Sequence, residues 1–210
     1  MKFNFDNVRD FDKHIELSVP DYNSMIHIVK EMIECFAGDG GTHLDVGCST
    51  GKLVLDVLDK GIDSIGVDMS SIIQNAPQLR KENYFNFNES TFDVITSIFF
   101  LQFMKPRSRK RALDKMVSEL ERGGRLIICE KTHFNDPVIE SVMDSSYLKF
   151  KRQHFTAEEI LEKKFQLAES MYLKTESQLM EELCEYGEVS TFWKSYGFIG
   201  VIVTPSHRIR

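Results

Sequence analysis

The residues whose types and spacing best suggest chemistry lie in one short segment and in an acid that follows it. The segment Asp45-Val46-Gly47-Cys48-Ser49-Thr50-Gly51 continues an apolar run, and Asp68 closes the next apolar run. Glycines at a strand-to-helix turn let the backbone approach a ligand closely, and a helix N-terminus offers free N–H groups. An acid at the tip of the next strand can accept hydrogen bonds from both hydroxyls of a ribose. This spacing predicts a nucleoside-containing ligand at the turn.

Two ligand families use such a turn, and two details separate them. Dinucleotide folds need a third glycine, in the pattern G-x-G-x-x-G, to seat a pyrophosphate. Here Ser49 takes the middle position and the third glycine is missing. The acid before the first glycine, Asp45, suits a ligand with an ammonium group, and S-adenosylmethionine (SAM) carries an ammonium, a ribose and a sulfonium. The turn therefore favours SAM over a dinucleotide.

The elements that must position these residues alternate between strands and helices. Apolar periodicity predicts helices over residues 23–36 and 52–59 and after Pro106, and strands over residues 43–46, 64–67, 92–98 and 125–130. We expect a short helix and a polar connection between Ile72 and Ser90, and Gly123-Gly124 as the end of the helix that starts after Pro106. This alternation is typical of a parallel α/β sheet.

The pattern changes after Glu130. No strand signal is present over 131–172, and a capping box at Thr156-Ala157-Glu158-Glu159 opens a helix. Four apolar side chains of that helix are expected to face inward, namely Ile160, Leu161, Phe165 and Ala168. A further helix is predicted over 176–186, and two β-like segments over 189–193 and 198–203 predict a terminal hairpin. We expect one domain over residues 1–210 with a helical insertion over residues 131–172.

Composition excludes several classes of protein. The chain is 42% hydrophobic with 16 phenylalanines, which is too apolar for a disordered chain, and its longest apolar stretches are too short to span a bilayer. The four cysteines form no C-x-x-C pair, so we expect no metal site, no disulfide framework and a cytoplasmic location. The net charge of -6 argues against a generally cationic nucleic-acid binder. We interpret the basic run 105–111 as a solvated helix start rather than a phosphate-contacting patch.

The ordered motifs and the terminal hairpin resemble the class I SAM-dependent methyltransferase superfamily. That resemblance implies a doubly wound, Rossmann-like α/β sheet with an antiparallel terminal hairpin and a helical insertion after the fifth strand. Within the superfamily the chain is most similar to the carboxy-SAM synthase family over residues 11–203. The similarity rests on Ser18-Val19-Pro20-Asp21-Tyr22, Asp45 to Ser49, Leu101-Gln102-Phe103, Glu130-Lys131 and Phe150-Lys151-Arg152.

The resemblance assigns roles to individual residues. It implies that Tyr22 lies over the ligand, that Gly47, Cys48 and Ser49 wrap its methionine part, and that Asp68 holds the ribose. It also implies that Met69 flanks the adenine, that the segment Glu82-Asn83 lies where an acid usually meets the adenine amine, and that Ser97 contacts the cofactor. Together with two residues of the turn, the predicted cofactor site is Tyr22, Asp45, Gly47, Cys48, Ser49, Gly51, Asp68, Met69, Asn83 and Ser97.

The resemblance also implies an activity and an assembly. Its family joins SAM to a carboxylate derived from prephenate, making carboxy-SAM for wobble-uridine modification of bacterial tRNA, and its insertion contributes to a homodimer contact. The family holds the added carboxylate with an arginine in the helix before the terminal hairpin, but the corresponding stretch here, Ser177 to Glu182, contains no basic residue. A carboxylate without a paired cation is poorly stabilised.

Three functional hypotheses follow. The first is SAM-dependent methyl transfer to a small-molecule or nucleic-acid acceptor, in which proximity and orientation carry most of the catalysis. The second is carboxy-SAM synthesis, with Lys151 and Arg152 or another cation in place of the missing arginine, and the third is a SAM-binding partner protein without catalysis. The substrate-binding candidates are Lys151, Arg152 and Tyr147 in the insertion, whereas Phe99, Phe100 and Phe103 are expected to pack under the sheet. No catalytic base is predicted.

Overall fold

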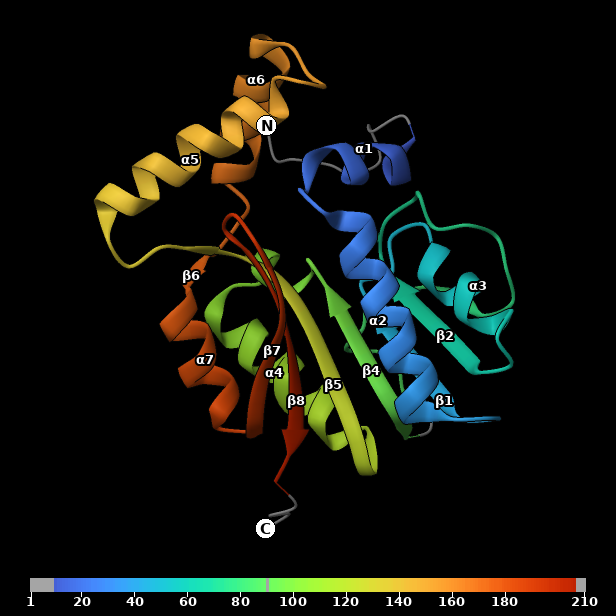
Figure 1. The fold of residues 1–210 in the computed structure, drawn as a ribbon. Coiled ribbons are helices and arrows are strands. Elements are labelled where there is room, and N and C mark those ends of the chain that lie inside the picture. The colour runs from blue at the N-terminus through green and yellow to red at the C-terminus, as the bar shows by residue number, and fades with distance from the viewer. Residues whose placement is uncertain (1–9, 90, 207–210) are drawn as a thin grey trace.

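The computed structural model describes residues 10–89 and 91–206 of the chain (Figure 1). Its helices are α1 (Phe11–Ser18), α2 (Tyr22–Ala37), α3 (Lys52–Leu58), α4 (Pro106–Ser118), α5 (Pro137–Lys151), α6 (Ala157–Ala168) and α7 (Glu176–Cys184), with a 3₁₀ turn at Leu101–Phe103. Its strands are β1 (Thr42–Val46), β2 (Asp63–Asp68), β3 (Leu79–Lys81), β4 (Phe92–Ile98), β5 (Leu120–His133), β6 (Lys174–Thr175), β7 (Gly187–Ser195) and β8 (Phe198–Pro205).

The strands form one twisted sheet in the order β3-β2-β1-β4-β5-β8-β7, and the short β6 pairs with the end of β5. The pairs β3-β2, β2-β1, β1-β4 and β4-β5 are parallel, whereas β8 is antiparallel to both β5 and β7. The terminal hairpin therefore inserts its last strand into the sheet. This confirms the predicted fold class.

Helices cover both faces of the sheet and enclose a core on each. Apolar side chains of α4 and α7 pack on one face, among them Leu113, Met116 and Leu183. Those of α2 and α3 pack on the other face, among them Val29, Ile33 and Val57. Because both faces are covered, the parallel strands read as continuous apolar runs, which is why their positions are predictable.

Two predictions around the sheet are wrong. Residues 72–89, the described part of the connection, contain the edge strand β3 rather than a short helix, because Leu79 to Lys81 pair with the end of β2. Gly123-Gly124 does not end a helix, since α4 already stops at Ser118 and the glycines lie within β5. The register of β5 against β4 shifts at this point, and Gly123 has a φ of 93°, so the glycines form a bulge.

The insertion after β5 consists of α5 and α6, which lie beyond the carboxyl ends of the strands near α1 (Figure 1). The capping box at the start of α6 is confirmed, because Thr156 and Glu159 bond each other's backbone N–H groups. Ile160 is buried as expected, but Leu161 and Phe165 are 53% and 67% exposed. Ala168 is exposed as well, so the expectation that these three side chains face inward is wrong, because α6 has a wider apolar surface than its neighbours cover.

A buried ion cluster connects α4, β5 and α7. The Arg109 guanidinium is 1% exposed and donates to Glu130 at 2.6 Å and to Glu182 at 2.8 Å. Arg109 belongs to the basic run that we interpreted as solvated, so this interpretation is wrong for one of its five cations. The run is amphipathic: Arg109 faces the core, whereas Lys110 pairs with Asp114 near the surface at 3.0 Å.

We predict that Arg109→Met lowers the free energy of unfolding by about 3–5 kcal/mol, because it leaves the Glu130 carboxylate buried without its cation. Urea unfolding followed by circular dichroism measures this loss. The matched control is Lys110→Met on the same helix, which breaks a solvent-exposed pair and is expected to leave stability nearly unchanged. Equal effects of the two substitutions would contradict the structural role of Arg109.

Candidate functional site

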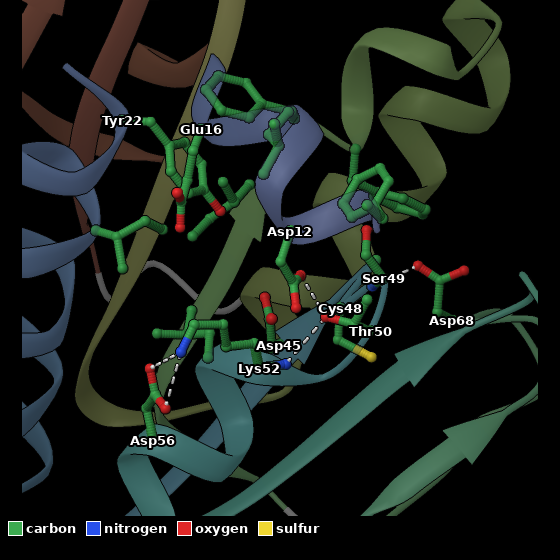
Figure 2. Close-up of a pocket in the computed structure, with 18 of the residues that line it drawn as sticks. Asp12, Glu16, Tyr22, Asp45, Cys48, Ser49, Thr50, Lys52, Asp56 and Asp68 are labelled. Atoms are coloured by element: carbon green, nitrogen blue, oxygen red, sulfur yellow. Dashed lines mark hydrogen bonds and ion pairs between the residues drawn. The ribbon is translucent and has the colours of Figure 1, made fainter. Parts of the chain in front are cut away.

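A cavity of about 530 Å³ lies at the carboxyl ends of β1, β2 and β4, beneath α1 (Figure 2). Its floor comes from the turn after β1 and its upper wall from α1 and the start of α2. The carboxyl ends of parallel strands are the usual place for ligand binding in open α/β sheets, because the loops there diverge and leave a crevice. The predicted turn is thus at the centre of the site.

The turn after β1 has the open backbone that the glycines predict. Gly47 has a φ of 81°, and a Cβ atom at this position would meet the ring of Phe100 at 2.4 Å. Ser49 also has a positive φ, of 53°, and its N–H donates to Asp68 Oδ2 at 2.9 Å. The N–H of Ser70 donates to Asp68 Oδ1 at 2.7 Å. The Asp68 carboxylate therefore joins the turn to the end of β2 and retains acceptor capacity for ligand hydroxyls.

Asp45 is held by a chain of polar side chains that crosses three strands. The Thr96 hydroxyl on β4 donates to Asp45 Oδ1 at 2.7 Å, so Thr96 accepts from His43 Nε2, which lies 2.9 Å away. His43 Nδ1 then accepts from the Ser64 hydroxyl at 2.7 Å. Burial lowers the pKa of His43 to about 3, so the imidazole is neutral, as this chain of donors requires.

Burial also makes Asp45 sensitive to a cation. Burial raises the pKa of Asp45 from 3.8 to about 7, the Thr96 hydrogen bond lowers it, and the Asp68 charge raises it. Because the folded state keeps the proton to a higher pH than the unfolded state, folding loses stability as the pH rises from about 4 through 7. An ammonium group beside Asp45 would offset this loss.

Acids outnumber available cations around the cavity. Its lining includes Asp12, Glu16, Asp45, Asp56 and Asp68, and its lysines are Lys30 and Lys52. Both lysines form ion pairs with Asp56, as Figure 2 shows for Lys52. The remaining acids give the cavity a negative potential that favours a cationic ligand.

A second cavity of about 330 Å³ lies on the other side of Asp68. It is lined by Met69, Asn83, Tyr84 and Phe85, among others, and it shares Asp68, Phe100 and Phe103 with the first cavity. Aromatic and thioether side chains suit a flat base. A ligand with a base, a ribose and a cationic tail fits the two cavities together, with the base in the second cavity, the ribose at Asp68 and the tail in the first cavity.

The phenylalanines that follow β4 line the two cavities. Phe99 and Phe100 line the first cavity, and Phe100 and Phe103 line both cavities. The expectation that they pack under the sheet is therefore correct only in part, because Phe99 and Phe100 pack against the two cores but all three rings also line a cavity. Phe99 has a φ of 54°, so the chain turns sharply at the end of β4 and projects these rings over the carboxyl edge.

Most predicted cofactor residues come together in the structure. Six line the first cavity, namely Tyr22, Asp45, Gly47, Cys48, Ser49 and Asp68, whereas Met69 and Asn83 line the second. Gly51 is the N-cap residue of α3, and Leu79 fills the space beside it. Ser97 is fully buried, and its Oγ has no hydrogen-bond partner among the described residues. Neither Gly51 nor Ser97 lines either cavity, so their contact with a cofactor stays a prediction.

Sequence reasoning missed the contribution of α1. Phe11, Asp12, Ile15 and Glu16 line the first cavity, and Asp12 accepts a hydrogen bond from the Thr50 hydroxyl at 2.8 Å. The available signal was the apolar pair Phe11 and Ile15 at i and i+4, together with Asp10, whose side chain caps the helix by accepting from Lys13 N. A helix of this length is too short for the pattern to stand out.

The substrate candidates in the insertion lie outside the lining of both cavities. The Tyr147 hydroxyl donates to the carbonyl oxygen of Ser18 at 2.8 Å, so Tyr147 connects α5 to the end of α1. Lys151 is buried behind this tyrosine, whereas Arg152 is exposed. Binding of substrate by these three residues stays a prediction.

Fold and site together define a class I SAM-dependent methyltransferase fold. Three observations fit SAM: a buried carboxylate for an ammonium, an acceptor carboxylate at the next strand end, and a turn in which Gly47 leaves no room for a side chain. The family model described as "Methyltransferase domain" matches residues 21–166. The chain belongs to this family, and it is a SAM-dependent transferase.

Comparisons with known proteins agree with this class. The chain is 26% identical to the carboxy-S-adenosyl-L-methionine synthase of Staphylococcus epidermidis, over 92% of this chain and 91% of the relative. It is 28% identical to the protein of the same name from Hydrogenovibrio crunogenus, over 94% and 87%. The fold resembles that of magnesium protoporphyrin IX methyltransferase from Synechocystis with bound S-adenosylhomocysteine (SAH), with a TM-score of 0.60, 14% identity and coverage of 95% and 88%. PH0226 from Pyrococcus horikoshii gives a TM-score of 0.62 with 12% identity, over 91% and 94% of the two chains.

Residues 10–89 and 91–206 contain no group of three or more His, Cys, Asp or Glu side chains that could hold a metal ion. Within the same residues, every helix is too short or too polar to cross a membrane.

We predict that Thr96→Val raises the pKa of Asp45 above its value of about 7, because the substitution removes the hydrogen bond that stabilises the carboxylate. An NMR titration of the aspartate carboxyl carbons measures this shift in the free protein. Thr50→Val is the control, since that hydroxyl donates to Asp12 instead. An unchanged Asp45 titration in Thr96→Val would contradict the proposed hydrogen-bond chain.

Proposed function

We propose that the chain transfers the methyl group of SAM to an acceptor that approaches beside α1 and the insertion. The observation that carries this proposal is the negative potential of the main cavity, where Asp12 and Asp45 form no ion pair with a described lysine or arginine and Glu16 pairs only with the exposed Lys13. In the same proposal Asp45 binds the ammonium of SAM, Asp68 binds its ribose, and the second cavity takes the adenine.

The charge balance favours methyl transfer over carboxy-SAM synthesis. An extra carboxylate in the main cavity would meet several acids and no available cation. Near α7, where the related family has its arginine, Arg109 and Lys174 both pair with Glu182. A carboxylate there would have to displace Glu182 from two ion pairs, one of them buried. Breaking these two pairs destabilises the protein by more than one new ion pair would stabilise the complex.

The residues of the site contribute alignment and exclusion of water. SAM, when bound, supplies a methyl group that its sulfonium already activates for transfer. Tyr22 and the rings of Phe99 and Phe100 form apolar walls around the cavity. Burial raises the pKa of the Cys48 thiol, so this cysteine stays protonated and is a poor nucleophile. Orientation of two reactants is therefore the chief catalytic contribution of the protein.

Carboxy-SAM synthesis for modification of tRNA is the second candidate. It is supported by the names of relatives such as those from Staphylococcus epidermidis and Hydrogenovibrio crunogenus, which this chain matches along most of its length. A second observation supports it: Lys131 and Lys151 lie behind the aromatic wall of the cavity without a carboxylate partner among the described residues. In both candidates we place the protein in the cytoplasm, where its four unpaired cysteines would stay reduced.

Mass spectrometry separates the two candidates. We predict that protein incubated with SAM and prephenate releases SAM or SAH and no carboxy-SAM, whereas SAM with a fractionated cell extract yields SAH and a methylated product. Asp45→Asn and Asp68→Asn should each lower the yield of SAH at least tenfold, as the loss of a charged hydrogen bond implies. Formation of carboxy-SAM from prephenate would reject methyl transfer in favour of the second candidate.

We further propose that the chain is one domain that forms a homodimer through the insertion. Exposed apolar side chains gather on α5, where Val138, Ile139 and Val142 are 70%, 50% and 61% exposed. Leu161 and Phe165 extend the exposed apolar surface onto α6. A monomer rarely exposes so many large apolar side chains on neighbouring helices, and such a patch typically marks an interface.

We predict that Val142→Asp converts the dimer to a monomer without unfolding it, because the side chain is already in water in the single chain. Sedimentation velocity at micromolar concentration measures the change. Thr191→Asp, an exposed site on β7, is the control and should leave the dimer intact. A wild-type protein that sediments as a monomer would contradict the proposal.

A further inference from the structure

Two lysines of the insertion and of β5 lie over a single aromatic ring. The Lys131 ammonium is 4.9 Å from the centre of the Tyr147 ring, and the Lys151 ammonium is 5.6 Å from it. Lys131 also lies over Phe198 at 5.7 Å, and Lys151 lies over Phe155 at 5.7 Å. Aromatic faces attract a cation, but one ring shared by two cations balances neither charge fully.

Neither lysine forms an ion pair with any described residue. Lys151 is only 8% exposed. The acids whose charges act on Lys131, Glu140 and Asp144, already form a hydrogen bond with His133 at 2.8 Å and an ion pair with Lys164 at 2.7 Å, respectively. Buried charges are normally paired, and two like charges repel each other.

The surroundings of the two lysines add further positive charge. The Lys163 ammonium on α6 lies 2.6 Å from Nε2 of His14 on α1. Both Lys163 and Lys151 lower the pKa of His14, after burial, and Lys131 lowers the pKa of Lys151 after burial. Lys131, Lys151 and Lys163 therefore form a basic cluster between α1, α5, α6 and β5, with the acids Glu140, Asp144 and Glu159 at its edge.

An aromatic layer connects this basic cluster to the main cavity. Phe99 in the cavity wall contacts the Phe198 ring at a centroid distance of 5.7 Å, and Phe198 contacts Tyr147 at 5.6 Å. The lysine pair is thus two rings away from the cavity. Beside Lys131, Tyr147 and Phe198 there is also a small cavity of about 30 Å³, enough for one water-sized group, and Glu140 and Asp144 line its other side.

We propose that Lys131 and Lys151 form an anion site that binds the carboxylate of an apolar, monoanionic acceptor. The aromatic rings around the pair suit the apolar body of such an acid. A carboxylate also fits the pair better than a phosphate, which carries more charge and is held more strongly by water. The inference rests on the proposed function, because the bound acid is the acceptor that SAM would meet.

Isothermal titration of SAH-saturated protein with benzoate tests the site, because benzoate combines one carboxylate with an aromatic body. Wild-type protein is expected to bind benzoate and not benzamide, its neutral analogue. Lys151→Met and Lys131→Met should each weaken benzoate binding at least tenfold. Lys149→Met, an exposed site on the same helix, is the control and should bind like wild type.

The free proteins give an independent readout. Without benzoate, Lys151→Met is expected to keep or raise the melting temperature, because it removes a buried charge that lacks an internal partner. If it instead lowers the melting temperature clearly, and Lys131→Met does the same, the lysines have a structural role and the proposal is overturned. Equal benzoate binding in wild type and in the variants, or tighter binding of inorganic phosphate than of benzoate, would also overturn it.

The titrations separate this inference from the proposed function. Loss of SAH binding with intact benzoate binding would reject the cofactor site alone. Intact SAH binding with no benzoate binding would reject the anion site alone. A single-stranded RNA oligonucleotide serves as a further probe, and RNA binding that depends on Lys131 and Lys151 would replace the carboxylate by a nucleic-acid acceptor and overturn the assignment.

Discussion

The burial of one carboxylate, that of Asp45, determines how the site works. Asp45 is 4% exposed at the end of β1, and a chain of Thr96, His43 and Ser64 across three parallel strands supplies its hydrogen bonds. Because the side chain is buried, water solvates its charge poorly, so an ionised Asp45 lowers stability unless a cation lies beside it. In the proposed function this cost makes Asp45 selective for a cation, and the rest of the cavity is arranged around it.

The parallel sheet brings the other parts of the site to the same edge. β1, β2 and β4 end side by side, so Asp45, Asp68 and Phe99 meet although they are far apart in sequence. Beyond this edge, an aromatic layer separates the acidic cavity from the basic cluster that contains Lys131 and Lys151. In the proposed function, the same aromatic layer would keep the charge of a cationic cofactor apart from the carboxylate of an anionic acceptor.

The parts of this arrangement that depend on local pattern were predictable. The strands that end at Val46 and Asp68, the turn at Gly47 and the terminal hairpin follow from apolar runs, glycines and an acid at fixed spacing. Features that depend on pairing between distant segments were not. The edge strand at Leu79 exists because it completes the sheet beside β2, and the glycines at 123 and 124 become a bulge because β5 must regain register with β4.

The same limit applies to side-chain roles. A run of cations gave no sign that Arg109 faces inward, because its partners Glu130 and Glu182 come from other elements. Likewise, the positive φ of Phe99, which turns three phenylalanines toward the cavity, depends on tertiary contacts and not on local sequence. Helix α1 is too short for its apolar pattern to predict that it covers the cavity. Lys131 and Lys151 are twenty residues apart in the sequence, and they lie over the same ring only because α5 packs over the end of β5.

The central claim is that Asp45 recognises the ammonium of the cofactor while Asp68 recognises its ribose. The most direct measurement compares the affinities of wild type, Asp45→Asn and Asp68→Asn for SAH and for 5′-methylthioadenosine, which keeps the adenine and ribose but lacks the amino-acid part. Asp45→Asn should weaken SAH binding about tenfold or more and leave 5′-methylthioadenosine unaffected, whereas Asp68→Asn should weaken both. An equal loss for both ligands in Asp45→Asn would contradict the claim.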